Sequence, residues 1–151
     1  MNYIQFSNAQ LLPEIFSLIA EGHTVTLRLR GNSMRPFLAD NRDKALLASP
    51  AAKPRKGDPV LAETAPHKYV LHRIVKVDGD NLTLRGDGNL NDEHCRCSDI
   101  RARVIGFYRK GSDKLDPIEG WKWKTYSFFW TRLYPIRRYL LAIHRRLYRY
   151  T

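Results

Sequence analysis

A serine at a sharp turn is the first feature of this sequence that could carry covalent chemistry. Apolar residues at alternate positions, Val25, Leu27 and Leu29, predict a half-buried strand just before it. Gly31 and Asn32 then end the strand, because both residue types tolerate the left-handed backbone of a tight turn. Ser33 follows directly, with Met34 as an apolar anchor and Pro36 stiffening the exit. Most Gly-x-Ser sequences are ordinary turns, so the stretch alone also fits a structural serine.

A serine hydroxyl needs a neighbouring base and a site for the developing oxyanion before it can act as a nucleophile. His72 lies in an apolar run and is the candidate base; Asp92 is our first candidate for the carboxylate that orients its ring, and Asp87 is the second. The Ser33 N–H and the Asn32 side chain are candidate oxyanion donors. Taken singly, each of these residues is more typical of structure than of catalysis, since aspartates in Gly-Asp sequences usually serve the turn itself.

The elements that would position these residues are mostly short strands. Apolar and β-branched patterns predict strands at 24–30, 45–48, 58–63, 69–77, 82–85 and 100–108. A helix is predicted from Leu11 or Leu12 to residue 21, with Pro13 in its first turn. Residues 86–93 read as a polar loop and residues 111–119 as a polar linker. The expected fold is mainly β, a small coiled sheet or β-barrel, with an N-terminal helix and a helical C-terminal tail.

The positive charge of this chain is concentrated at its C-terminus. The net charge is +11, and residues 121–151 contain eight basic residues and no acidic one. We therefore divide the chain into a helical segment at 1–23, a domain at 24–110 that holds the candidate catalytic residues, and a linker with a basic aromatic tail at 111–151.

The tail has the composition of a segment that binds an anionic membrane surface. Pro135 divides it, and the apolar residues beyond Pro135 repeat at helical spacing. Candidate interface residues are Trp121, Trp123, Trp130, Arg137, Arg138 and Arg145. The alternatives are a helix that packs back on the body with its arginines in water, or a helix that binds nucleic acid or another partner, of which nucleic acid is the one we least expect.

No cofactor or metal site is expected. Cys95, Cys97 and the neighbouring His94 are too few ligands for a structural zinc, and two reduced thiols are usual in a cytoplasmic protein. No run approaches the roughly 20 apolar residues of a membrane span, and Met1 to Phe6 do not resemble a secretory signal. The expected location is cytoplasmic, peripheral on the inner face of the membrane.

Five short blocks occur together in one order: Gly-x-Ser-Met-x-Pro-x-Leu, Gly-Asp-x-Val, Leu-His-Arg-Ile-Val, Gly-Asp-x-Asn with a further Asp, and Val-Ile-Gly. They lie within residues 24–108, at 31–38, 57–60, 71–75, 86–92 and 104–106. This ordered set resembles the signal peptidase I superfamily, which includes the self-cleaving SOS-type repressors. A histidine at position 72, where bacterial enzymes of the superfamily have lysine, is similar to the archaeal and endoplasmic-reticulum branch.

The resemblance implies a serine endopeptidase with Ser33 as nucleophile, His72 as general base, and Asp92 or Asp87 as the third member. Met34 and Pro36 would contact a substrate bound as an extended strand. Gly88 departs from the family pattern, which usually has Asn there, and we see no N-terminal membrane anchor, so a small leader peptide is a more plausible substrate than a secreted preprotein. Two alternatives are a non-catalytic peptide- or partner-binding module on this fold, and a basic membrane- or nucleic-acid-associated protein whose tail is its function.

Overall fold

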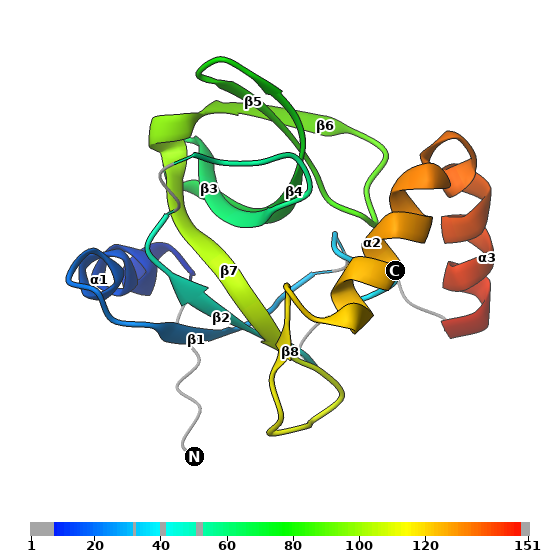
Figure 1. The fold of residues 1–151 in the computed structure, drawn as a ribbon, viewed down its shortest axis with the longest axis horizontal. Helices are drawn as coiled ribbons and strands as arrows, with labels where there is room; N and C mark the ends of the chain where they lie inside the picture. The colour runs from blue at the N-terminus through cyan, green and yellow to red at the C-terminus, as the bar shows by residue number, and fades with distance from the viewer. Residues whose placement is uncertain (1–7, 32, 40–41, 51–52, 149–151) are drawn as a thin grey trace.

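The computed structural model describes residues 8–31, 33–39, 42–50 and 53–148 (Figure 1). The fold is mainly β with helices at both ends, as predicted. The strands are β1 (Val25–Arg28), β2 (Lys44–Ala48), β3 (Pro59–Ala65), β4 (Lys68–Asp78), β5 (Asn81–Arg85), β6 (Asp92–Arg96), β7 (Ile100–Tyr108) and β8 (Asp116–Pro117). The helices are α1 (Asn8–Ala20), α2 (Trp121–Arg132) and α3 (Arg137–Tyr148), with short 3-10 turns at Cys97–Asp99 and Tyr134–Ile136.

The eight strands form one antiparallel sheet. Seven of them follow the order β1-β2-β7-β3-β4-β5-β6, and β8 pairs with the C-terminal part of β7, at Gly106 and Phe107. Register shifts in four of the pairings bend the strands, because a bulge kinks a strand locally. The sheet therefore curls, and β3 to β6 wrap around one another in the upper half of Figure 1.

Two apolar cores follow from this curl. The larger core lies among α1, the Ser33 loop, β2, β7 and α2, and contains Ile19, Phe37, Leu47, Phe107 and Trp123. The smaller core lies inside the curl of β3 to β6, where Ile74, Leu82 and Leu84 are buried. Strand β4 passes between the two, so three consecutive residues, His72, Arg73 and Ile74, are all buried.

Three local elements differ from the sequence prediction. Helix α1 includes Asn8, so Pro13 lies inside the helix rather than in its first turn. Pro13 removes one helical hydrogen bond, but it sits on the exposed side of α1 near the N-terminal end. The loop predicted at 86–93 already contains the start of β6, and the linker at 111–119 contains β8.

Candidate active site

Ser33 and His72 line one small cavity of about 130 Å³. The walls come from the segment after β1, residues 29–31, from the Ser33 loop, and from the beginning of β4, residues 69–72. His72 is 3% exposed, whereas Ser33 is half-buried. The fold thus brings a serine and a histidine that are far apart in sequence to the same cavity. Among the described residues, no hydrogen bond joins the Ser33 hydroxyl to His72.

The loop after β5 presses against the Ser33 backbone. The Gly88 N–H donates to the Ser33 carbonyl at 2.7 Å, and the Asn89 N–H donates to Gly86 at 2.9 Å. A Cβ on Gly86 would collide with the Ser33 carbonyl oxygen and would lie only 2.9 Å from His72 Nε2. Glycine is required at position 86 because the backbone approaches both the serine loop and the histidine there.

The carboxylate beside the histidine belongs to Glu93. Glu93 Oε2 lies 3.1 Å from His72 Nδ1, and both atoms are buried without a hydrogen bond in the described residues. The pair is in ion-pair range, although the N–H is not well aligned for a hydrogen bond. Burial lowers the pKa of His72 below its ordinary value of 6.5, and Glu93 offsets part of this effect. The ring is therefore mostly neutral at pH 7.

The two predicted aspartates lie elsewhere. Asp92 points outward from β6 and pairs with Arg85, its cross-strand neighbour, at 2.5 Å and 2.9 Å. Asp87 is fully buried and accepts two hydrogen bonds from Arg73, at 2.9 Å and 2.8 Å. Neither carboxylate is at the His72 ring. Sequence reasoning missed Glu93 because it did not detect β6, whose alternation turns Glu93 inward and Asp92 outward.

The other predicted substrate-binding residues have mixed positions. Met34 is buried and lines the cavity, and its sulfur accepts the Asp87 N–H at 3.5 Å. Pro36 follows a cis peptide bond and does not line this cavity. Asn32, one of the two candidate oxyanion donors, lies outside the described residues.

Asp43 closes the loop that carries Ser33. Its carboxylate accepts the Ala39 N–H at 2.8 Å, the Lys110 N–H at 2.9 Å and the Arg42 guanidinium at 2.8 Å. Its carbonyl accepts the Leu29 N–H at 2.9 Å, which ties the two ends of the loop together. Burial alone would raise the pKa of Asp43, but these donors lower it below its ordinary value. No pattern in the sequence singles this residue out.

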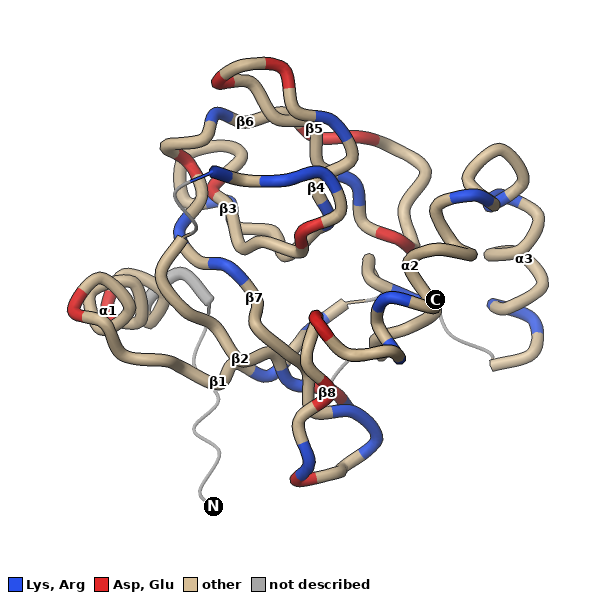
Figure 2. The backbone as a smooth tube through the Cα atoms, viewed as in Figure 1, with Lys and Arg blue, Asp and Glu red and all other residues tan. Residues whose placement is uncertain are grey.

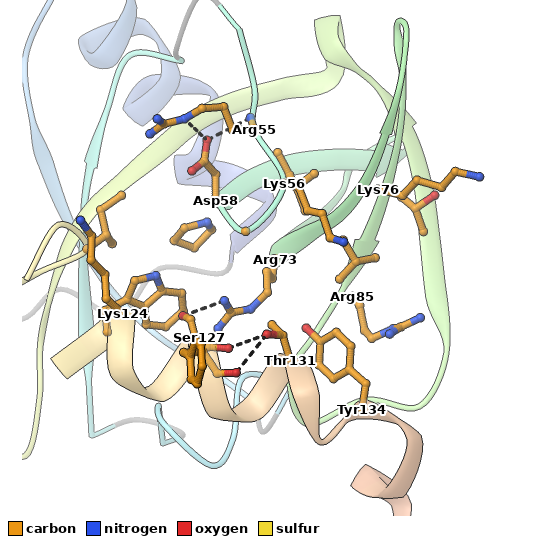
Figure 3. Close-up of a pocket in the computed structure, with 18 of the residues that line it drawn as sticks. Arg55, Lys56, Asp58, Arg73, Lys76, Arg85, Lys124, Ser127, Thr131 and Tyr134 are labelled. Atoms are coloured by element: carbon orange, nitrogen blue, oxygen red, sulfur yellow. Dashed lines mark hydrogen bonds and ion pairs between the residues drawn. The ribbon is translucent and has the colours of Figure 1, made fainter. Parts of the chain in front are cut away.

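Helix α2 packs on the body beneath the candidate site. Trp123 and Trp130 are buried; the Tyr126 hydroxyl donates to Asp87 at 2.7 Å, and the Trp130 indole N–H donates to the Asp87 carbonyl at 3.2 Å. Arg73 also donates to Ser127 at 2.8 Å, the bond marked in Figure 3. Two of the three predicted interface tryptophans are thus packing residues.

The remaining predicted interface residues divide in the same way. Arg137 donates to the Asn89 and Leu90 carbonyls at 3.3 Å and 2.9 Å, so it fastens the tail to the loop after β5. Trp121, Arg138 and Arg145 are exposed. Within the part of the chain that the structure describes, each helix is too short or too polar to span a membrane.

The two cysteines and the neighbouring His94 lie apart from the candidate active site. Cys95 and Cys97 are free, and burial raises the pKa of Cys95 to about 11, which keeps its thiol protonated. His94 lies 3.4 Å from the Thr83 hydroxyl. Among the described residues, no group of three or more His, Cys, Asp or Glu side chains is arranged to hold a metal ion.

The candidate site is a buried histidine that lies between a carboxylate and a serine loop on a curled antiparallel sheet. Comparison of the sequence with protein-family models and with curated proteins found no match.

Proposed function

We propose that this protein is a serine endopeptidase that resembles signal peptidase I and cleaves a peptide or leader bound as an extended strand. The observation that carries the proposal is the position of His72, with Glu93 at its Nδ1 and Ser33 in the same cavity. A neutral, buried histidine with a carboxylate at one nitrogen is suited to act as a general base through the other.

In the proposed reaction, Ser33 Oγ attacks the carbonyl carbon of the scissile bond while His72 Nε2 takes the hydroxyl proton. The histidine then delivers that proton to the leaving amine. In the second half of the reaction, water attacks the acyl-enzyme while His72 takes a proton from it, and His72 returns this proton to Ser33 Oγ as the acid product leaves. Glu93 would hold the Nδ1–H tautomer and stabilise the imidazolium. The Ser33–His72 hydrogen bond would form when a substrate closes the cavity, since catalytic hydrogen bonds are often long or poorly aligned in the free enzyme.

The sheet provides an edge where an extended peptide could bind. Strand β4 pairs with β3 along its first half, but β5 joins the other side of β4 only from Arg73 onward. Residues 68–72 therefore have one edge with no strand beside it among the described residues, and this edge leads directly to His72. A peptide added there would be hydrogen-bonded through its backbone, which favours substrates by conformation more than by side chain.

The first test is peptide cleavage by wild type, Ser33→Ala and His72→Ala, measured with a peptide library and mass spectrometry. We expect each substitution to lower the cleavage rate by at least about 1,000-fold while the circular dichroism spectrum stays unchanged. Lys114→Ala is the matched control, because Lys114 is exposed and does not line the Ser33 cavity. Cleavage that survives in Ser33→Ala would reject the proposal and favour a non-catalytic peptide-binding module.

We also propose that α3 places the enzyme on an anionic membrane surface. Ile136, Tyr139, Ile143 and Leu147 recur at helical spacing and are 46%, 67%, 56% and 73% exposed. Arg138, Arg145 and Arg146 are exposed on the same helix, and Figure 2 shows the cationic segments of α2 and α3 in blue. The sequence of residues 121–151 contains no acid. An apolar face bordered by cations complements a bilayer with anionic headgroups better than a neutral protein surface.

Vesicle co-sedimentation tests this assignment. Wild type should bind phosphatidylcholine vesicles only after phosphatidylglycerol is added, and the double variant Ile143→Asp, Leu147→Asp should bind at least about tenfold more weakly. Leu18→Asp, at an exposed position of α1, is the control. Equal vesicle binding by the double variant, or a change in its self-association instead, would contradict a membrane role for this face.

A further inference from the structure

A second, larger cavity lies between the sheet and α2, separate from the Ser33 cavity. Its volume is about 980 Å³, and its walls come from the loop before β3, from β4 and β5, and from α2 (Figure 3). The two cavities share no lining residue. On β4, the neighbouring residues His72 and Arg73 belong to different cavities, as expected for side chains that alternate across a strand.

The cavity has an excess of positive charge that its own acids do not neutralise. Seven basic and three acidic side chains line it. The acids are already paired, Asp58 with Arg55, Glu119 with Lys124, and Asp92 with Arg85. The pairs show that carboxylates fit among these cations.

Three cations of the cavity have no carboxylate partner among the described residues. Lys56 and Lys76 are exposed at its walls, and Arg132 stacks on the Phe128 ring with 3.9 Å between its guanidinium carbon and the ring centroid. They come from three different elements, the loop before β3, β4 and the end of α2. Cations spread in this way match several carboxylates along a chain better than one compact phosphate, which favours convergent donors.

The cavity also contains an unused hydrogen-bond donor. The Tyr134 hydroxyl is buried without a partner in the described residues, although its ring lies 4.8 Å from the Arg85 guanidinium. Burial raises the pKa of Tyr134 to about 12, so this hydroxyl remains neutral and adds no negative charge. A buried donor between cations is suited to an incoming acceptor oxygen.

We propose that this cavity is an exosite that binds an acidic segment of the peptide substrate, with Lys56, Lys76 and Arg132 pairing with its carboxylates. The substrate class rests on the proposed peptidase function. Apolar walls from Trp123, Phe128 and Ile118 would accept side chains between the acidic residues. Binding here, on the opposite face of β4 from His72, would hold a substrate without blocking the Ser33 cavity.

The test measures binding separately from cleavage. Fluorescein-labelled hexaglutamate peptide is titrated against Ser33→Ala protein by fluorescence anisotropy at low salt, with hexaglutamine peptide as the neutral probe. Lys56→Glu, Lys76→Glu should weaken hexaglutamate binding at least about tenfold, because two attractions become repulsions. Lys53→Glu, Lys114→Glu carries the same change in net charge outside the cavity and should weaken it by less than about twofold.

Three outcomes would overturn the exosite: equal weakening by both double variants, equal affinity for the two peptides, or tighter binding of inorganic tripolyphosphate than of hexaglutamate at the cavity. The last would assign it to a phosphate ligand. Failure of the peptidase proposal looks different, since wild type would then cleave no peptide while the cavity variants still lost hexaglutamate binding. If both hold, the cavity variants should raise KM for acidic substrates and leave kcat unchanged.

Discussion

At the scale of single residues, the candidate site depends on which of two adjacent acids turns inward. Asp92 and Glu93 occupy successive positions of β6, and side chains of a strand alternate between its faces. Glu93 therefore reaches the buried His72 ring, while Asp92 meets Arg85 at the surface. A shift of one residue in the pairing of β5 and β6 would exchange their roles.

This arrangement predicts different effects for two conservative substitutions. Glu93→Gln should lower kcat about 100-fold or more, since the imidazolium loses its counter-charge. Glu93 raises the pKa of His72 against the larger effect of burial, so its removal should move the acid limb of the kcat/KM profile to lower pH. Asp92→Asn breaks a partly exposed pair and should change kcat much less. A limb that moves to higher pH in Glu93→Gln, or an equal loss in both variants, would contradict this assignment.

At the scale of elements, α2 is part of the body that supports the site. Asp87 lies in the loop that contacts Ser33, and it is held by Arg73 from β4 and by Tyr126 and Trp130 from α2. The Arg73 guanidinium also stacks on Trp123, 4.4 Å from its ring. This buried network joins the strand that carries the histidine, the loop that touches the serine, and the tail.

We expect substitutions in α2 to report on this network through stability. Trp130→Ala should lower the free energy of unfolding by about 3 kcal/mol or more, because it leaves a cavity and removes a donor. Tyr126→Phe should cost about 1–2 kcal/mol, since a buried carboxylate oxygen loses one partner. Urea unfolding measures both. Phe129→Ala on the exposed side of α2 should cost less than about 0.5 kcal/mol; a similar cost for all three would argue against specific docking.

At the scale of the whole molecule, stability should depend on pH through groups whose pKa is lowered by folding. The pKa of Asp43 lies below its ordinary value of 3.8, and that of His72 below 6.5. In each case the unfolded chain binds the proton more readily, so stability rises with pH through the corresponding window and is lost as pH falls.

Urea unfolding across the pH range should therefore show two losses of stability on acidification. The first begins below pH about 6.5 and should be absent in His72→Gln; the second begins below pH about 4 and should be reduced in Asp43→Asn. Asp43→Asn should also be less stable than wild type at neutral pH by about 2 kcal/mol, because the Arg42 and backbone donors lose a charged acceptor. Constant stability between pH 7 and 5 in wild type would contradict the buried neutral histidine.

Much of the fold could be predicted from local patterns in the sequence. Alternation and β-branched runs located six of the eight strands, and helical spacing located α1 and α3. Strands β6 and β8 were missed because their residues are polar or include proline, so neither carries an apolar alternation. Their pairing partners, β5 and β7, stabilise them instead.

The sequence alone determined the mainly β class, the serine turn, the buried histidine strand and the basic amphipathic tail, because each depends on the types and spacing of residues that are neighbours in the chain. Only the tertiary structure decided that Glu93 faces His72, that Asp87 serves Arg73, and that Trp123 and Trp130 are covered by the body. These outcomes depend on strand register and helix docking, which join residues distant in sequence. Strand β6 carries no apolar alternation, so its local spacing did not indicate which of Asp92 and Glu93 the long-range pairing would bury.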